Sequence, residues 1–135
     1  MSRSLYGLMM PVLLCVAVSC GKKQDVDQQA ASCLRDSRMA LSAGDYVKAK
    51  SYIDTLRLKY PTALNAREEG ILLLDSINIK ESKKELEEME KKISGIENPT
   101  PVQKDTLDFY YDEAKEKVRF FERKLQHDLQ NKESH

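Results

Sequence analysis

The sequence predicts an all-α protein: a helix-turn-helix unit followed by a long antiparallel helical hairpin that is coiled-coil-like. The 135 residues include only five glycines and four prolines, and a third of the residues are charged. Low glycine and proline content, together with many lysines, glutamates, leucines and alanines, favours helices. Apolar residues recur at spacings of three and four along four segments, which is the period of a helix with one apolar face. These observations together indicate four amphipathic helices.

The first twenty residues have the pattern of an export signal. Arg3 precedes an apolar stretch from Leu5 to Val18, too short for a transmembrane helix, which needs about twenty apolar residues. The stretch ends at Ala17-Val18-Ser19-Cys20, which resembles the lipobox of bacterial lipoproteins. This resemblance implies that residues 1–19 are a signal peptide and that the Cys20 thiol carries acyl chains. The alternative is an ordinary secretory signal with a chance cysteine.

Acylation at Cys20 would attach the mature chain to a membrane through its N-terminal lipid. Bacterial lipoproteins resemble one another in carrying two or three acyl chains, and more than one chain is needed for stable attachment. Gly21 stands where an Asp would favour the inner membrane in enterobacteria-like sorting, so the outer membrane is favoured. Residues 20–27 are polar and lack periodicity, and we expect them to form a lipidated tether. A single helical domain is expected over residues 28–135.

Two shorter helices are expected at the start of this domain. The first runs from about Asp27 to Ala43, and Gly44 is placed to end it in the left-handed conformation. Asp45 can cap the second helix, which stops before Pro61. The apolar faces comprise Ala30, Cys33 or Leu34, Ser37, Ala40 and Leu41 in the first helix, and Tyr46, Ala49, Ile53, Leu56 and Tyr60 in the second.

A long hairpin over residues 62–131 follows, with its turn at residues 95–99. The third helix should run from about Thr62 to Ser94, with a heptad row of Leu72, Ile79, Leu86 and Ile93 whose companion row is interrupted by Asp75 and Ser82. The fourth should run to about Asn131, because Thr100, Pro101 and Gln103 are typical of a helix start with a capping box. Its heptad comprises Leu107, Tyr111, Ala114, Val118, Phe121 and Leu125.

The short turn requires that the two long helices are antiparallel neighbours. We therefore expect Leu107, Tyr111 and Ala114 to meet Ile93, Met89 and Leu86 across the hairpin. The segment from Val118 to Leu125 is further expected to approach Ile79, Leu72 and the two N-terminal helices.

The segment GDYVKAKSYIDTLRLKYPTA, which begins at Gly44, resembles the second half of a tetratricopeptide repeat. Ala49 matches the small residue where the two helices of a repeat cross, and Pro61 matches the terminal proline. The segment is particularly similar to repeats of BamD-type outer-membrane assembly lipoproteins. The resemblance covers about residues 30–75, with residues 28–75 as the tetratricopeptide-like part, and it implies a protein-binding scaffold. Cys33 and Asp36 depart from the pattern, and with at most one and a half repeats we expect no full concave peptide groove.

Several function classes have no support in the composition. The formal net charge is zero, so a basic footprint for nucleic acid is absent and no nucleic-acid partner is expected. His127 and His135 are the only histidines, and no His, Cys or carboxylate set has metal-ligand spacing. Cys33 is left without a disulfide partner and is expected to pack as a small apolar residue. We expect no catalytic residue, no metal and no cofactor beyond the covalent lipid on Cys20, and therefore not an enzyme.

Two aromatic pairs lie on the fourth helix: Tyr110 with Tyr111, and Phe120 with Phe121. Core packing explains one member of each pair, and the hypothesis is that Tyr110 and Phe120 remain partly exposed as a partner-binding site. The resulting expectation is a lipid-anchored, non-enzymatic scaffold or adaptor that binds a protein of the bacterial cell envelope. The alternative is a self-associating coiled-coil structural lipoprotein, in which the heptads pair between copies as a homo-oligomer.

Overall fold

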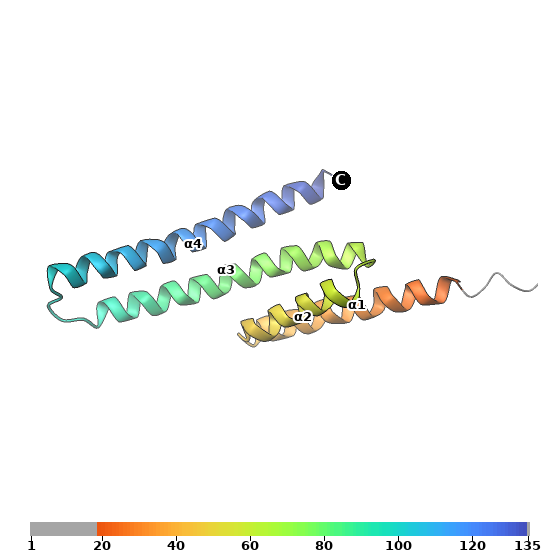
Figure 1. Ribbon diagram of the computed structural model, residues 1–135, viewed down its shortest axis with the longest axis horizontal. Coiled ribbons are helices and arrows are strands. Elements are labelled where there is room, and N and C mark those ends of the chain that lie inside the picture. Colours follow the sequence, from red (N-terminus) through yellow and green to blue (C-terminus); the bar gives the residue numbers. More distant parts are fainter. Residues whose placement is uncertain (1–18, 135) are drawn as a thin grey trace, which may run out of the picture.

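The computed structural model describes residues 19–134, with side chains from Gln24 onward, and in this part of the chain it contains only helices. The helices are α1 (Ser19–Ser42), α2 (Tyr46–Lys59), α3 (Leu64–Ser94) and α4 (Pro101–Glu133). Figure 1 shows α1 and α2 as a short hairpin beside the first half of α3, with α4 running along the full length of α3. The all-α prediction is therefore confirmed.

The chain reverses between α1 and α2 as the local sequence predicts. Gly44 has a φ of +75°, a left-handed conformation that costs glycine no steric strain. The Asp45 carboxylate accepts a hydrogen bond from the Lys48 backbone N–H at 2.9 Å and so caps α2. The first helix begins earlier than expected.

The predicted irregular tether, residues 20–27, is helical, because α1 already starts at Ser19. Two kinds of contact extend the helix. Gln29 donates to Asp25 one turn earlier and accepts from the Tyr60 hydroxyl, while Val26 packs against the core. The body of the domain therefore stabilises a segment whose own sequence lacks helical periodicity.

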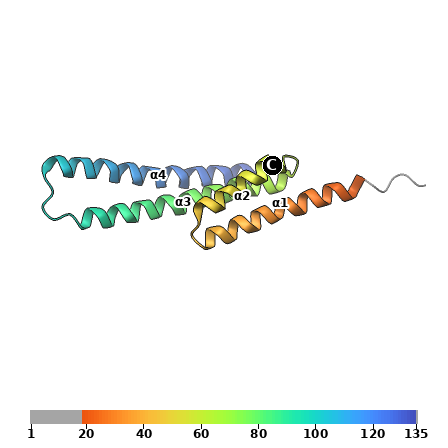
Figure 2. The same ribbon diagram turned by 60° about the horizontal axis from the view of Figure 1, so that its bottom comes forward.

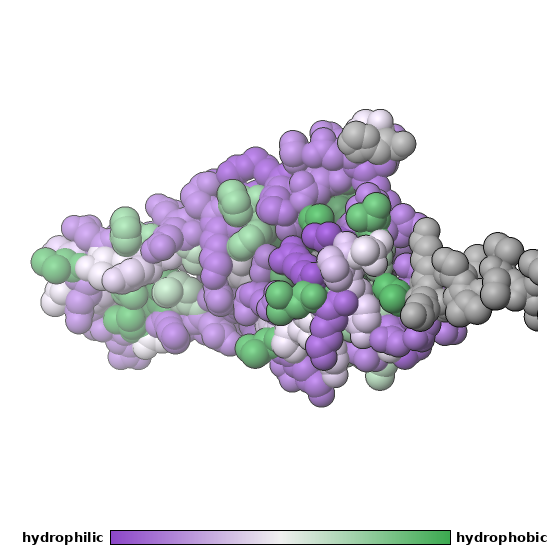
Figure 3. All heavy atoms as spheres, turned by 45° about the vertical axis from the view of Figure 1, so that its right-hand side comes forward, coloured by the Kyte–Doolittle hydropathy of each residue, from purple (hydrophilic) through white to green (hydrophobic). Residues whose placement is uncertain are grey.

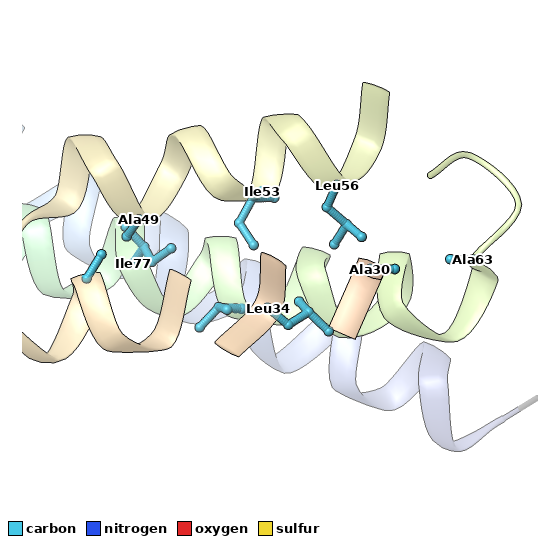
Figure 4. Packing of buried hydrophobic residues seen from close by; sticks show 9 residues of the cluster. Ala30, Leu34, Ala49, Ile53, Leu56, Ala63 and Ile77 are labelled. Carbon is cyan, nitrogen blue, oxygen red and sulfur yellow. The ribbon is translucent and has the colours of Figure 1, made fainter. Parts of the chain in front are cut away.

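The hydrophobic core lies between α1, α2 and the first half of α3. Figure 4 shows Ala30 and Leu34 of α1 facing Ile53 and Leu56 of α2, with Ile77 of α3 next to Ala49. Buried alanines let the helices approach closely, and Gly70 of α3 does the same: a Cβ there would lie 2.9 Å from Leu56 Cδ2. At the crossing of α1 and α2, the buried Ser37 hydroxyl donates to the Ala49 carbonyl oxygen at 2.8 Å.

The turn between α3 and α4 also lies where the sequence predicts it, between Ser94 and Pro101. The left-handed residue is Asn98, with a φ of 53°, whereas Gly95 remains right-handed. Asparagine tolerates this region better than most side chains do. Thr100 and Gln103 form the expected capping box at the start of α4.

The hairpin is antiparallel. Tyr111 donates to Glu90, Lys117 pairs with Glu85, and Lys124 pairs with Asp75, so the partners descend along α3 as they ascend along α4. Figure 2 shows the same two helices side by side in a second orientation.

The expected approach of residues 118–125 to the two N-terminal helices is wrong. Within the described chain α4 packs against α3 alone. The reason is that α3 lies between them and uses opposite faces: Leu73 and Ile77 pack into the core with α1 and α2, and Asp75 is bound from α4.

Candidate functional site: the outer face of α4 and the start of α1

The predicted lipidation site lies at one end of the molecule. Cys20 falls in the first turn of α1, which extends beyond the ends of the other helices in Figures 1 and 2. Residues 1–18 of the predicted signal peptide lie outside the described residues, as does the side chain of Cys20. Lipidation and signal cleavage therefore stay predictions. No helix between residues 19 and 134 is long and apolar enough to cross a membrane.

The two aromatic residues singled out as a partner site are exposed. Tyr110 is 50% exposed and Phe120 is 55% exposed, whereas Tyr111 and Phe121, their neighbours, are half-buried. Within each pair one ring is exposed and the other is half-buried, and the Tyr111 hydroxyl reaches Glu90 on α3. The role of Tyr110 and Phe120 as a partner-binding site stays a prediction. The rings of Phe120 and Phe121 meet edge to face with centroids 5.2 Å apart.

Phe109 is a third exposed aromatic residue that the sequence reasoning missed. It is 66% exposed and meets the Tyr110 ring edge to face at 5.6 Å. Nine residues separate it from the buried Val118, which is two and a half helical turns and places it on the opposite side of α4. That spacing was readable from the sequence. We call Phe109, Tyr110 and Phe120 the outer aromatic face.

Tyr111 shows how the inward member of a pair is held. Its hydroxyl donates to the Glu90 carboxylate at 3.1 Å, and this hydrogen bond raises the pKa of Tyr111. The Lys115 ammonium lies 5.1 Å from the centroid of the same ring. These contacts fix the rotation of α4 and thereby fix which rings face solvent.

A buried polar layer crosses the hairpin farther along. Asp75 is 1% exposed and receives two hydrogen bonds from Lys124 Nζ, at 2.8 and 2.9 Å, while Asp128 accepts a third at 2.8 Å. Burial raises the pKa of Asp75 even though Lys124 opposes the shift. Burial alone would lower the pKa of Lys124, but its two carboxylate partners raise it. The hydrogen bond from Lys124 lowers the pKa of Asp128.

This layer has a structural explanation. All of the donor capacity of one ammonium group is directed at two carboxylates. The one further base among the contacts of this layer, His127, meets Asp128 from the exposed surface. A polar group at one level of an apolar seam specifies register, because a slipped helix would leave the Asp75 charge without its cation. Ser82, one heptad along α3, is also buried, and its hydroxyl has no hydrogen-bond partner among the described residues.

Cys33 and His127 are the remaining candidates among the described residues. Cys33 is half-buried at the edge of the core, and burial, followed by the nearby Asp36, raises the pKa of its thiol. A raised pKa keeps the thiol protonated and unreactive. Residues 24–134 contain no group of three His, Cys, Asp or Glu side chains that could hold a metal ion. His127 is exposed and hydrogen-bonds with Asp128 and Asn131.

An open hollow of about 450 Å³ lies between α1 and the start of α3. Its lining combines alanines and leucines with polar residues, among them Asp27, Arg38 and Glu69, and Arg38 pairs with Glu69.

Comparison with known proteins gives no match: no family model, no curated protein and no solved structure is similar to this chain. The resemblance to tetratricopeptide repeats and to BamD-type lipoproteins therefore depends on the residues quoted above.

Proposed function

We propose that this protein is a lipid-anchored, non-enzymatic scaffold or adaptor of the bacterial cell envelope, attached through Cys20 to the outer membrane. Its outer aromatic face would bind a protein partner. The observation that carries the proposal is the separation of these two features: Cys20 lies at one end of the molecule, and Phe109 and Tyr110 lie toward the other.

The helical start of α1 supports an anchor of this kind. Because the helix begins at Ser19, acyl chains on Cys20 would join directly to the folded body. The α3–α4 turn lies at the opposite end, and α4 is about 50 Å long at 1.5 Å per residue. A partner could then be held at a fixed distance from the bilayer rather than at the end of a flexible linker.

Exposed aromatic rings support a protein partner. Aromatic side chains often anchor interfaces, because they bury large areas at little cost in conformational entropy. The three rings of the outer aromatic face are between 50% and 66% exposed and therefore have surface left to bury. Because α4 packs against α3 alone among the described helices, a partner bound to the outer side of α4 would not contact the core formed by α1, α2 and α3.

Site-specific photo-crosslinking in intact membranes tests this function. A photoreactive residue at Phe109 should give a discrete crosslinked product, and the same residue at Val47, which is 79% exposed on α2, should not. The product should disappear when Cys20→Ser is combined with a cleavable secretory signal, because the released protein leaves the membrane. Equal products from both positions would contradict a specific face, and a product containing only a second copy would favour the self-associating structural lipoprotein.

Substitution of the aromatic pairs separates binding from folding. The double variant Tyr110→Ala, Phe120→Ala should abolish the crosslinked product without lowering the melting temperature. The matched control Tyr111→Ala, Phe121→Ala, one residue along in each pair, should lower the melting temperature by several degrees because these rings pack toward α3. A comparable loss of stability in the Tyr110 and Phe120 variant would assign those rings to the core.

A further inference from the structure

The end of the molecule at which α1 begins exposes aliphatic side chains. The end of α2, the start of α3 and the end of α4 meet there in Figures 1 and 2. Exposed aliphatic residues at this end are Leu58 (81%), Leu64 (65%), Ile71 (39%) and Leu129 (43%). Figure 3, with this end turned forward, shows hydrophobic residues set among hydrophilic ones.

Part of this surface is hollowed. One hollow of about 370 Å³ lies between α2 and α3 and is lined by Arg57, Leu64, Arg67, Glu68 and Ile71. A second, of about 240 Å³, lies between α3 and α4, and its lining includes Leu72 and Lys132. The two share Glu68 and Ile71, so they form one continuous surface across three helices. We call it the basal surface.

Positive charge is left uncompensated on the basal surface. Arg57, Arg67 and Lys132 form no ion pair with any described residue. Of the two carboxylates in the lining, Asp128 is already bound by Lys124, which leaves Glu68 as the single opposing charge. Aliphatic side chains surrounded by unpaired basic groups are complementary to the interface of a bilayer that contains anionic phospholipid.

We propose that the basal surface lies on the bilayer, with Leu64 and Ile71 at the level of the headgroups and with Arg57 and Lys132 against anionic phospholipid. The inference rests on the proposed anchor, because a lipid on Cys20 would bring this end of the molecule to the membrane. Acyl chains together with a basic apolar surface form a two-part attachment, which also sets the orientation of the body. Phe109 and Tyr110 then lie toward the end of the molecule that is away from the membrane.

Tryptophan fluorescence gives a direct test, because the chain contains no tryptophan. Leu64→Trp and Phe109→Trp place one reporter at each end, at residues that are 65% and 66% exposed. The full-length protein, expressed so that it is processed and lipidated, is reconstituted into vesicles of phosphatidylethanolamine and phosphatidylglycerol. The emission of the Leu64→Trp variant should shift to shorter wavelength and be quenched by brominated acyl chains, whereas the emission of the Phe109→Trp variant should do neither.

Charge reversal tests the electrostatic part. Arg57→Glu with Lys132→Glu, in the Leu64→Trp background, should abolish most of the quenching. The control Lys91→Glu with Lys92→Glu reverses two exposed lysines near the α3–α4 turn and should leave the quenching unchanged. Circular dichroism establishes that each variant is folded.

Flotation of the vesicles distinguishes the two proposals. If the protein floats with the vesicles but the two reporters respond alike, the basal surface does not touch the bilayer and the inference fails while the anchor stands. If the protein does not float, both the anchor and the membrane-facing surface are overturned. Quenching that survives the reversal of Arg57 and Lys132 would refute the role given to those two residues.

Discussion

Replacing Lys124 by Met tests the buried polar layer most severely. The side chain keeps much of its length, but the Asp75 carboxylate loses both of its hydrogen bonds and its counter-charge while remaining 1% exposed. Breaking a buried pair by removing one partner costs about 3–5 kcal/mol. The Lys124 side chain is 39% exposed, so water can reach the site in the variant, and we take the lower end, about 3 kcal/mol. For a domain of this size that corresponds to roughly 12 °C in melting temperature.

The stability lost on replacing Lys124 by Met should depend on pH in a defined direction. Burial raises the pKa of Asp75 in the folded protein above its ordinary value of 3.8. Ionisation of Asp75 therefore lowers the free energy of unfolding as the pH rises from 3.8 through the raised pKa. Without Lys124 the raised pKa moves higher still. The deficit of Lys124→Met relative to the wild type should therefore be smallest in acid and full near neutral pH.

Thermal unfolding followed by circular dichroism, from acid to neutral pH, measures this deficit. The control is Lys124→Met combined with Asp75→Leu, which removes the buried charge together with its partner and should recover most of the stability. A deficit below about 1 kcal/mol, or one that does not change with pH, would refute the assignment of Asp75 as a buried charge held by Lys124.

Two further substitutions test the packing. Ser82→Ala should leave the melting temperature unchanged or raise it, because the buried Ser82 hydroxyl has no partner to lose, and a clear drop would show that the hydroxyl is bonded. Ser37→Ala should cost about 1 kcal/mol in denaturant unfolding, because it removes the buried hydrogen bond to the Ala49 carbonyl. No change at Ser37 would mean that this bond adds nothing to the crossing of α1 and α2.

Local signals in the sequence predicted the turns and caps correctly. Gly44, Asp45 and Thr100 act through backbone groups within three residues of themselves, so their roles do not depend on the rest of the fold. The heptad on α4 likewise predicted the seam of the hairpin, since it needs only the helical period. The split of each aromatic pair into one inward and one outward ring follows from the same period.

Features that depend on distant residues were not predictable. In the sequence Asp75 only interrupts the predicted seam of α3. Its partner Lys124 lies 49 residues away and outside the predicted heptad of α4. The early start of α1 depends on Tyr60 and on the core beneath Val26. The separation of α4 from α1 and α2 follows from the use of two opposite faces by α3, which one apolar periodicity does not reveal.

The central claim is a protein scaffold fixed to a membrane by lipid at Cys20, and intact mass spectrometry of the membrane-extracted protein tests it most directly. We expect a chain that begins at Cys20 and carries a diacylglyceryl group on that thiol, with or without a further acyl chain on the new amino terminus. A chain that begins at another residue, or one that begins at Cys20 with an unmodified thiol, would contradict it.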